Sequence, residues 1–252
     1  MELLEETLGS IGPLDSDAER AAAGRLDSLT KPPGSLGYLE RAVRRYAAIR
    51  GDGSAQMGRA AIAVFVADHG VADEGVSAFP QAVTVEMLRN LASGGAAISV
   101  LARRLGYDLR IIDVGVKSDT SSVPIGGVIY RRIGAGTANF VRGPAMSREQ
   151  VRRALQVGIE VARELAEDGV TLLGIGEMGI ANSTAAAAVL SAITEIAPSG
   201  LAGRGTGLDE AGVLRKVAII EQALKLHSGS LQTGESILGA LGGFEIAAMA
   251  GT

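Results

Sequence analysis

Apolar and polar positions follow two patterns along the chain. Three short apolar runs are typical of strands buried on both faces of a parallel sheet, and they cover residues 61–67, 109–112 and 170–175. Between them, apolar residues recur at helical spacing over residues 81–91, 95–105 and 147–167. The alternation predicts an α/β fold, in which an open, mostly parallel, Rossmann-like sheet carries helices on both faces.

The first fifty residues show only the helical pattern. Asp15 or Ser16 can cap one helix and Ser35 can begin a second, while the paired prolines Pro32 and Pro33 impose an extended loop between them. A Gly-Asp-Gly-Ser stretch typical of a linker follows. We therefore expect a small N-terminal helical subdomain and a larger α/β domain, residues 1–52 and 53–252.

Polar residues mark where later helices begin. Ser147 and Gln150 form a capping box, and Asp209 can cap a helix that runs to about Lys225. Helices are also expected over an Ala-rich segment and over a tail of small residues, residues 182–195 and 235–249.

The predicted strands end in polar or glycine-rich turns. These turns are Asp68-His69-Gly70, Asp113-Val114-Gly115 and residues 174–179. In open α/β sheets a ligand binds outside the carboxyl ends of the strands. The three turns are therefore expected to line one crevice.

The third turn, Gly-Ile-Gly-Glu-Met-Gly, leads into the Ala-rich helix and is the most informative segment. Glycines and the N–H groups at a helix start suit a phosphate. Glu177 would repel a phosphate, so it should face a cationic or proton-bearing part of the ligand. A second glycine-rich loop, residues 203–207, contains Arg204 and Thr206 and precedes a helix with Lys216. Two such elements favour a phosphorylated ligand. The alternatives are that the first set of glycines only allows tight packing of strand on helix, and that the second segment is a solvated surface loop.

Other interpretations of the motifs are weaker. Gly174, Gly176 and Gly179 formally match a dinucleotide fingerprint, but Glu177 stands at the phosphate position and no acidic residue ends the next strand. An NAD-dependent oxidoreductase is therefore a secondary hypothesis. His69 is expected to be a hydrogen-bonded structural residue, with a base or a ligand contact as alternatives. Two histidines and no cysteines give little support to a metal site.

Composition narrows the functional classes further. The chain has 252 residues, 47% of them hydrophobic, a formal net charge of −4 and no cysteine. These values exclude disulfides and cysteine nucleophiles, and they argue against nucleic acid or an anionic membrane as partner. No apolar run is long enough to span a bilayer, and the acidic start differs from a secretory signal. We expect a cytoplasmic protein.

Six segments occur in the order found in one family: residues 29–37 (Leu-Thr-Lys-Pro-Pro-Gly-Ser-Leu-Gly), 68–71 (Asp-His-Gly-Val), 79–84 (Phe-Pro-Gln-Ala-Val-Thr), 113–115 (Asp-Val-Gly), 174–184 (Gly-Ile-Gly-Glu-Met-Gly-Ile-Ala-Asn-Ser-Thr) and 203–207 (Gly-Arg-Gly-Thr-Gly). Over nearly its whole length the chain resembles the nicotinate-nucleotide–dimethylbenzimidazole phosphoribosyltransferases of cobalamin lower-ligand assembly. The first and fifth segments are the most specific.

The resemblance implies transfer of 5-phosphoribosyl from nicotinate mononucleotide to 5,6-dimethylbenzimidazole or a related azole, giving α-ribazole 5′-phosphate and nicotinate. Nicotinate leaves as a neutral ring nitrogen, so no leaving-group acid is required. A carboxylate should stabilise the oxocarbenium-like centre at C1′, and a base must take the benzimidazole N–H proton. The resemblance also implies a homodimer and no metal or redox cofactor.

The resemblance assigns roles by position in the α/β nucleotide-binding domain. Glu177 is implied as the active-site carboxylate. The phosphoribosyl group would be held by Gly176, Gly179, Asn182, Ser183 and Thr184, and its phosphate by Gly203, Arg204, Gly205, Thr206 and Lys216. The benzimidazole slot is implied at Ser77, Phe79, Pro80, Gln81 and Met178.

One feature departs from the family pattern. Family members continue beyond the Gly-Gly-Phe-Glu-Ile-Ala-Ala-Met-Ala-Gly segment at residues 242–251. The further portion supplies more of the sheet, closing helices and a glycine-flanked glutamate regarded as the base. We therefore expect weak or absent turnover, with a nucleotide- or base-binding protein as the alternative, and apolar surface left on the N-terminal helices.

Overall fold

The computed structural model describes residues 2–120, 122 and 124–252. The chain divides into two compact units, Glu2–Gly58 and Arg59–Thr252. This division follows Gly58, whereas the sequence placed the boundary after residue 52. Residues 53–58 belong with the helices because Gly53 packs on a neighbouring helix, where a Cβ atom would lie 2.5 Å from that of Ala21.

The N-terminal unit contains three helices, α1 (Glu2–Ser10), α2 (Ser16–Ser28) and α3 (Tyr38–Arg50). Helix α2 begins as expected, since the Asp15 carboxylate accepts hydrogen bonds of 2.9 Å from the next N–H groups. The prediction that Ser35 begins the next helix is wrong. Successive turns carry the chain past Ser35, and Gly37, at φ 56°, precedes α3.

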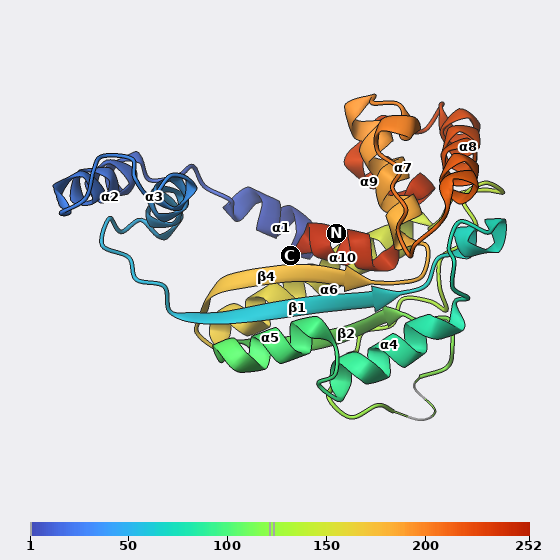
Figure 1. The fold of residues 1–252 in the computed structure, drawn as a ribbon, viewed down its shortest axis with the longest axis horizontal. Helices are drawn as coiled ribbons and strands as arrows, with labels where there is room; N and C mark the ends of the chain where they lie inside the picture. The colour runs from blue at the N-terminus through green and yellow to red at the C-terminus, as the bar shows by residue number, and fades with distance from the viewer. Residues whose placement is uncertain (1, 121, 123) are drawn as a thin grey trace. The chain divides into compact units, whose positions relative to one another are not determined.

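The second unit is built on four parallel strands (Figure 1). These are β1 (Arg59–Ala67), β2 (Asp108–Gly115), β3 (Val128–Tyr130) and β4 (Val170–Met178). Their spatial order is β3-β2-β1-β4, which confirms the Rossmann-like parallel sheet. The chain moves outward from β1 through β3 and then returns to the other side of β1. The topological switch point, where ligands bind in such sheets, therefore lies between β1 and β4.

Helices cover both faces of this sheet. Helices α4 (Ala82–Ala92) and α5 (Ala97–Leu105) lie on one face, and α10 (Phe244–Gly251) lies on the other, with α6 (Arg148–Glu167) packed against it (Figure 1). On the α4 side, Val64 and Val66 of β1 pack against Leu88 and Leu91. Because strand side chains alternate, Phe65 points to the α10 side and is fully buried there.

The remaining helices lie in the segments that follow β1 and β4. The short η1 (Gly70–Glu74) follows β1, and β4 is followed by α7 (Asn182–Thr194), the short η2 (Pro198–Gly200), α8 (Glu210–His227) and α9 (Gly234–Leu241). The capping box of α6 and the Asp209 cap of α8 are confirmed. The expected tail helix is two helices, since the chain breaks at Gly242, where a Cβ atom would lie 2.6 Å from the Leu238 carbonyl oxygen. No helix in the described part of the chain is long and apolar enough to cross a membrane.

Helices α6 and α10 touch backbone to backbone. A Cβ atom at Gly158 would lie 1.9 Å from the Ala248 carbonyl oxygen, and one at Gly251 would lie 2.0 Å from that of Leu155. Only glycine allows so close an approach. These two glycines therefore fix how α10 lies on the sheet.

The crossing predicts a specific stability change. Gly158→Ala should lower the free energy of unfolding by about 1–3 kcal/mol, because the added methyl group forces the two helices apart. Gly239→Ala in α9 is the matched control, since its new Cβ atom would meet neighbours at 3.6 Å, an ordinary contact distance. Chemical denaturation of both variants measures the difference, and equal unfolding free energies would show that the crossing does not need glycine.

Candidate functional site

The carboxyl ends of β1, β2 and β4 meet at one edge of the sheet, as predicted. The backbone N–H of Asp68 donates a 3.0 Å hydrogen bond to the Gly115 carbonyl oxygen. On the other side of β1, Gly179 packs so closely that a Cβ atom would lie 2.0 Å from the carbonyl oxygen of Ala67. The three segments singled out in the sequence therefore lie together at the carboxyl edge of the sheet.

Strand β4 is longer than the sequence indicated. It runs to Met178, so Gly174 and Gly176 are strand residues that pair with Ile62 and Val64. A dinucleotide-binding loop needs its glycines in the turn that follows the strand. The formal fingerprint match therefore has no structural basis here.

Glu177 lies near the end of β4, opposite Phe65 of β1. The register places its side chain on the face that α10 covers. The side-chain amide of Asn182, the first residue of α7, donates a hydrogen bond to its Oε2 atom. Sequence reasoning placed both residues in the site, and the structure brings them into contact.

The surroundings of Glu177 disfavour its charged form. Desolvation by the neighbouring protein atoms, together with the carboxylate of Glu245, raises the pKa of Glu177 to about 7, although His69 acts in the opposite direction. The side chain is still exposed. Glu177 is therefore an exposed carboxyl group that changes charge near neutral pH.

A buried acid–imidazole pair lies beside Glu177. Nε2 of His69 is 2.7 Å from Oε1 of Glu245 in α10, and both side chains are almost completely buried. Burial acts to lower the pKa of His69, but Glu245, with smaller contributions from Asp68 and Glu177, raises it above the usual value. The prediction that His69 is hydrogen-bonded is confirmed. Sequence reasoning missed Glu245, whose only signal was one acid in an apolar tail.

A second buried network joins β1 to the turn after β4. The Thr84 hydroxyl donates a 2.6 Å hydrogen bond to the Asp68 carboxylate and accepts one of 3.1 Å from the Ile180 N–H. The backbone N–H of Lys117 donates a 2.8 Å bond to the other carboxylate oxygen. Burial raises the pKa of Asp68, against these hydrogen bonds. The network holds the start of α7 in place.

The two glycine-rich segments lie side by side. Nζ of Lys216 in α8 donates hydrogen bonds of 3.1 Å to the Ser183 hydroxyl and to the Gly203 carbonyl oxygen. A Cβ atom at Gly205 would lie 2.8 Å from the Ser183 hydroxyl oxygen. Lys216 is 1% exposed, and burial lowers its pKa. Among the described residues, no carboxylate forms an ion pair with it, so this buried cation has only neutral partners.

The segment expected to bind the base reaches the same place. The Ser77 hydroxyl lies 3.0 Å from the Thr206 hydroxyl, which also accepts a 3.0 Å hydrogen bond from the Ala78 N–H. The side-chain amide of Gln81 donates a 2.6 Å bond to the His69 carbonyl oxygen. Phe79 is 54% exposed. Residues 77–81 therefore border the loop at 203–207.

Other predicted residues lie less directly at the site. Met178 points to the opposite face of β4 from Glu177 and packs against the core beneath α4. The guanidinium group of Arg204 donates a 3.4 Å hydrogen bond to the Leu208 carbonyl oxygen, within its own loop. Thr184 is buried and Pro80 is exposed. Their ligand contacts stay predictions.

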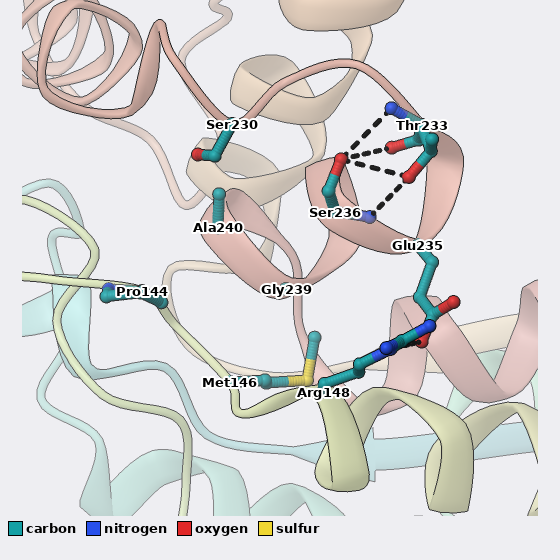
Figure 2. Close-up of a pocket in the computed structure, with 9 residues that line it drawn as sticks. All are labelled: Pro144, Met146, Arg148, Ser230, Thr233, Glu235, Ser236, Gly239 and Ala240. Atoms are coloured by element: carbon teal, nitrogen blue, oxygen red, sulfur yellow. Dashed lines mark hydrogen bonds and ion pairs between the residues drawn. The ribbon is translucent and has the colours of Figure 1, made fainter.

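A separate cavity of about 320 Å³ lies between the start of α6, residues 230–236 and α9 (Figure 2). Its walls include Met146 and Ala240, with Arg148 and Glu235 paired at 3.0 Å beside them. None of the residues predicted for the site lines it.

Comparison with known proteins identifies the family. The family model described as Phosphoribosyltransferase matches residues 11–252. The nicotinate-nucleotide–dimethylbenzimidazole phosphoribosyltransferase of Chloroflexus aggregans is 48% identical over 251 residues, which cover 100% of this chain and 70% of that protein. The enzyme of the same name from Azotobacter vinelandii is 52% identical, covering 97% of this chain and 69% of that protein.

A solved structure agrees with the sequence relatives. The crystal structure of CobT from Thermus thermophilus matches with a TM-score of 0.86 and 42% identity, covering 93% of this chain and 70% of that one. The chain therefore belongs to the phosphoribosyltransferase family that includes the nicotinate-nucleotide–dimethylbenzimidazole phosphoribosyltransferases.

Proposed function

We propose that this protein transfers 5-phosphoribosyl from nicotinate mononucleotide to 5,6-dimethylbenzimidazole. One observation carries the proposal beyond family membership. Two consecutive residues at the start of α7 contact opposite charges: Asn182 donates to the Glu177 carboxylate, and Ser183 accepts from the Lys216 ammonium group. A carboxylate and a cation thus flank one helix start, as a sugar phosphate with a cationic anomeric centre requires.

The chemistry assigns the acid to the anomeric carbon. The bond between C1′ and the pyridinium nitrogen breaks, and its electron pair returns to the nicotinate ring. A benzimidazole nitrogen then forms a bond to C1′, and the N–H proton of the other ring nitrogen leaves to a base or to water. Positive charge develops at C1′ in between, so an ionised Glu177 lowers the energy of this transition state.

The phosphate end of the substrate suits the Lys216 region. Two of the three ammonium donors of Lys216 are used by Ser183 and Gly203, which leaves one for a phosphate oxygen. The first N–H groups of α7 add favourable partial charges. The sugar phosphate would therefore extend from Glu177 along the start of α7 towards Lys216.

The residues that bind the base, the oligomeric state and the location are further expectations. Ser77, Phe79 and Gln81 are proposed to meet the flat base because their segment contacts Thr206. The homodimer and the cytoplasmic location stay predictions. A binding protein that does not turn over is the alternative function.

A direct assay separates these functions. The chain is incubated at high concentration with nicotinate mononucleotide and dimethylbenzimidazole, and nicotinate and α-ribazole 5′-phosphate are followed by chromatography. Equal amounts of both products support the transfer. Nucleotide binding without either product favours the binding protein, and hydride transfer from NADH would favour an oxidoreductase.

The charge of Glu177 predicts a pH dependence. Because the carboxylate must be ionised and its pKa is about 7, the transfer rate should fall roughly tenfold per pH unit below 7 and level off above it. Glu177→Gln should remove this acid limb and lower the rate by about 10²–10³-fold, with nucleotide affinity changed only a few-fold. Initial rates from pH 5.5 to 9 measure this, and an unaltered profile would remove Glu177 from the mechanism.

Lys216 predicts an effect on affinity. Lys216→Met should raise the Kd of nicotinate mononucleotide by roughly 10–100-fold, because a charge-assisted hydrogen bond to phosphate is lost. Lys225→Met, at an exposed position of the same helix, is the matched control and should leave the Kd unchanged. Calorimetry at fixed ionic strength compares them. Equal affinities in the two variants would place the phosphate elsewhere.

A further inference from the structure

The pair formed by His69 and Glu245 is more completely buried than Glu177, yet the transfer chemistry does not call on it directly. Their exposed side-chain fractions are 1% and 0%, and Nε2 and Oε1 are 2.7 Å apart. Nδ1 of His69 and Oε2 of Glu245 are buried without a hydrogen-bond partner among the described residues. Burying polar atoms that lack a hydrogen-bond partner costs stability.

Glycine residues allow the backbone to pack closely around the pair. A Cβ atom at Gly243 would lie 2.4 Å from Cε1 of His69, and one at Gly179 would lie 3.5 Å from its Cδ2. Phe244, the neighbour of Glu245, is fully buried in a gap left by Gly115, where a Cβ atom would lie 2.4 Å from the ring. The backbone at Gly243 therefore packs directly against the pair.

Three carboxyl groups face this one imidazole. They are Glu245 from α10, Asp68 at the end of β1 and Glu177 at the end of β4. Glu245 and Glu177 lie on the same side of the sheet, and Glu245 opposes the negative charge of Glu177. Burial opposes the charged form of this imidazole, and the three acids favour it.

We propose that His69 and Glu245 are positioning residues for the phosphoribosyl transfer, a buried pair on the same side of the sheet as Glu177 that acts on the charge of its carboxyl group. The inference rests on the proposed function only in giving Glu177 its role at C1′. Desolvation is the largest cause that disfavours the charge of Glu177, Glu245 adds its repulsion, and His69 acts against both. Glu177 is therefore only partly ionised at neutral pH, because its pKa is about 7. A cationic substrate that binds beside it favours the ionised form.

Removing one charge changes the balance in a known direction. In Glu245→Gln the repulsion of Glu177 disappears, and His69 loses the partner that favours its own positive charge. The repulsion is the larger of the two effects on Glu177. The titration midpoint of Glu177 should therefore fall, by about one pH unit for a like charge at this range.

The titration can be read without any turnover. Glutamate labelled with ¹³C at the carboxyl carbon is incorporated, and the Glu177 resonance is assigned by its absence in Glu177→Gln. Glu245→Gln should lower the Glu177 midpoint by about one pH unit. Glu245→Asp keeps the charge and should keep the midpoint raised. Glu235→Gln in α9 removes an acid that is paired with Arg148 and Arg152, and should leave the midpoint unchanged.

The outcomes are distinct. If Glu245→Gln is folded and the Glu177 midpoint does not move, the proposal is overturned. If Glu245→Gln does not fold, Glu245→Asp is the deciding variant, because it keeps the negative charge. A Glu177 midpoint that drops to the ordinary glutamate value in Glu245→Asp would also overturn the proposal. Where nicotinate release is measurable, its acid limb should shift with the midpoint. A shifted midpoint with no release in any variant would contradict the proposed function and leave the charge coupling standing.

Discussion

The structure depends on backbone approaches that only glycine permits. Gly158 and Gly251 bring α6 and α10 into backbone contact, and Gly179 brings the end of β4 against the carbonyl of Ala67. The first contact sets the position of α10 and hence of Glu245. The second sets the position of Glu177. The electrostatics of the site therefore follow from packing, because both acids are carried by segments that pack closely against their neighbours.

Several features of the site oppose stability. Lys216 is buried with no carboxylate partner in the described part of the chain, and Glu177 is held where its charge is disfavoured. Ala181, directly before α7, has a φ of 74°, a left-handed conformation that costs an L-residue roughly 1–2 kcal/mol. The Asp68–Thr84–Ile180 network and the tight β1–β4 contact hold this turn in place. Unfavourable groups gathered at one sheet edge are typical of functional sites.

The features that were predicted correctly depend on interactions between residues close in sequence or on general rules of sheets. The apolar run of β1, the Asp15, Ser147 and Asp209 caps and the meeting of strand ends were all accessible, because each depends on neighbours in sequence or on a general rule of sheets. Glu177 stood out for the same reason, as an acid in a glycine-rich turn. The three-residue β3 gave no signal of its own, since its pairing with β2 supplies its structure.

What could not be predicted depends on contacts between distant residues. His69 and Glu245 are 176 positions apart, and no local sequence pattern around either residue indicates that the two are in contact. The length of β4 was underestimated because Gly174 and Gly176 suggest a turn, whereas pairing with β1 holds them extended. The same error placed Met178 in the ligand turn, although as a strand residue it must point away from Glu177.

Charge balance links this arrangement to the proposed reaction. Nicotinate mononucleotide brings a pyridinium cation to Glu177, and that cation offsets the repulsion from Glu245. Once the bond to C1′ breaks, nicotinate leaves with a neutral ring, and the positive charge passes to C1′ and then to the benzimidazolium ring. The N–H group of that ring is acidic, and its proton can pass to Glu177, whose charge Glu245 opposes. A carboxyl group with a pKa near 7 can stabilise positive charge early in such a cycle and accept a proton late, whereas one with an ordinary pKa would remain ionised throughout.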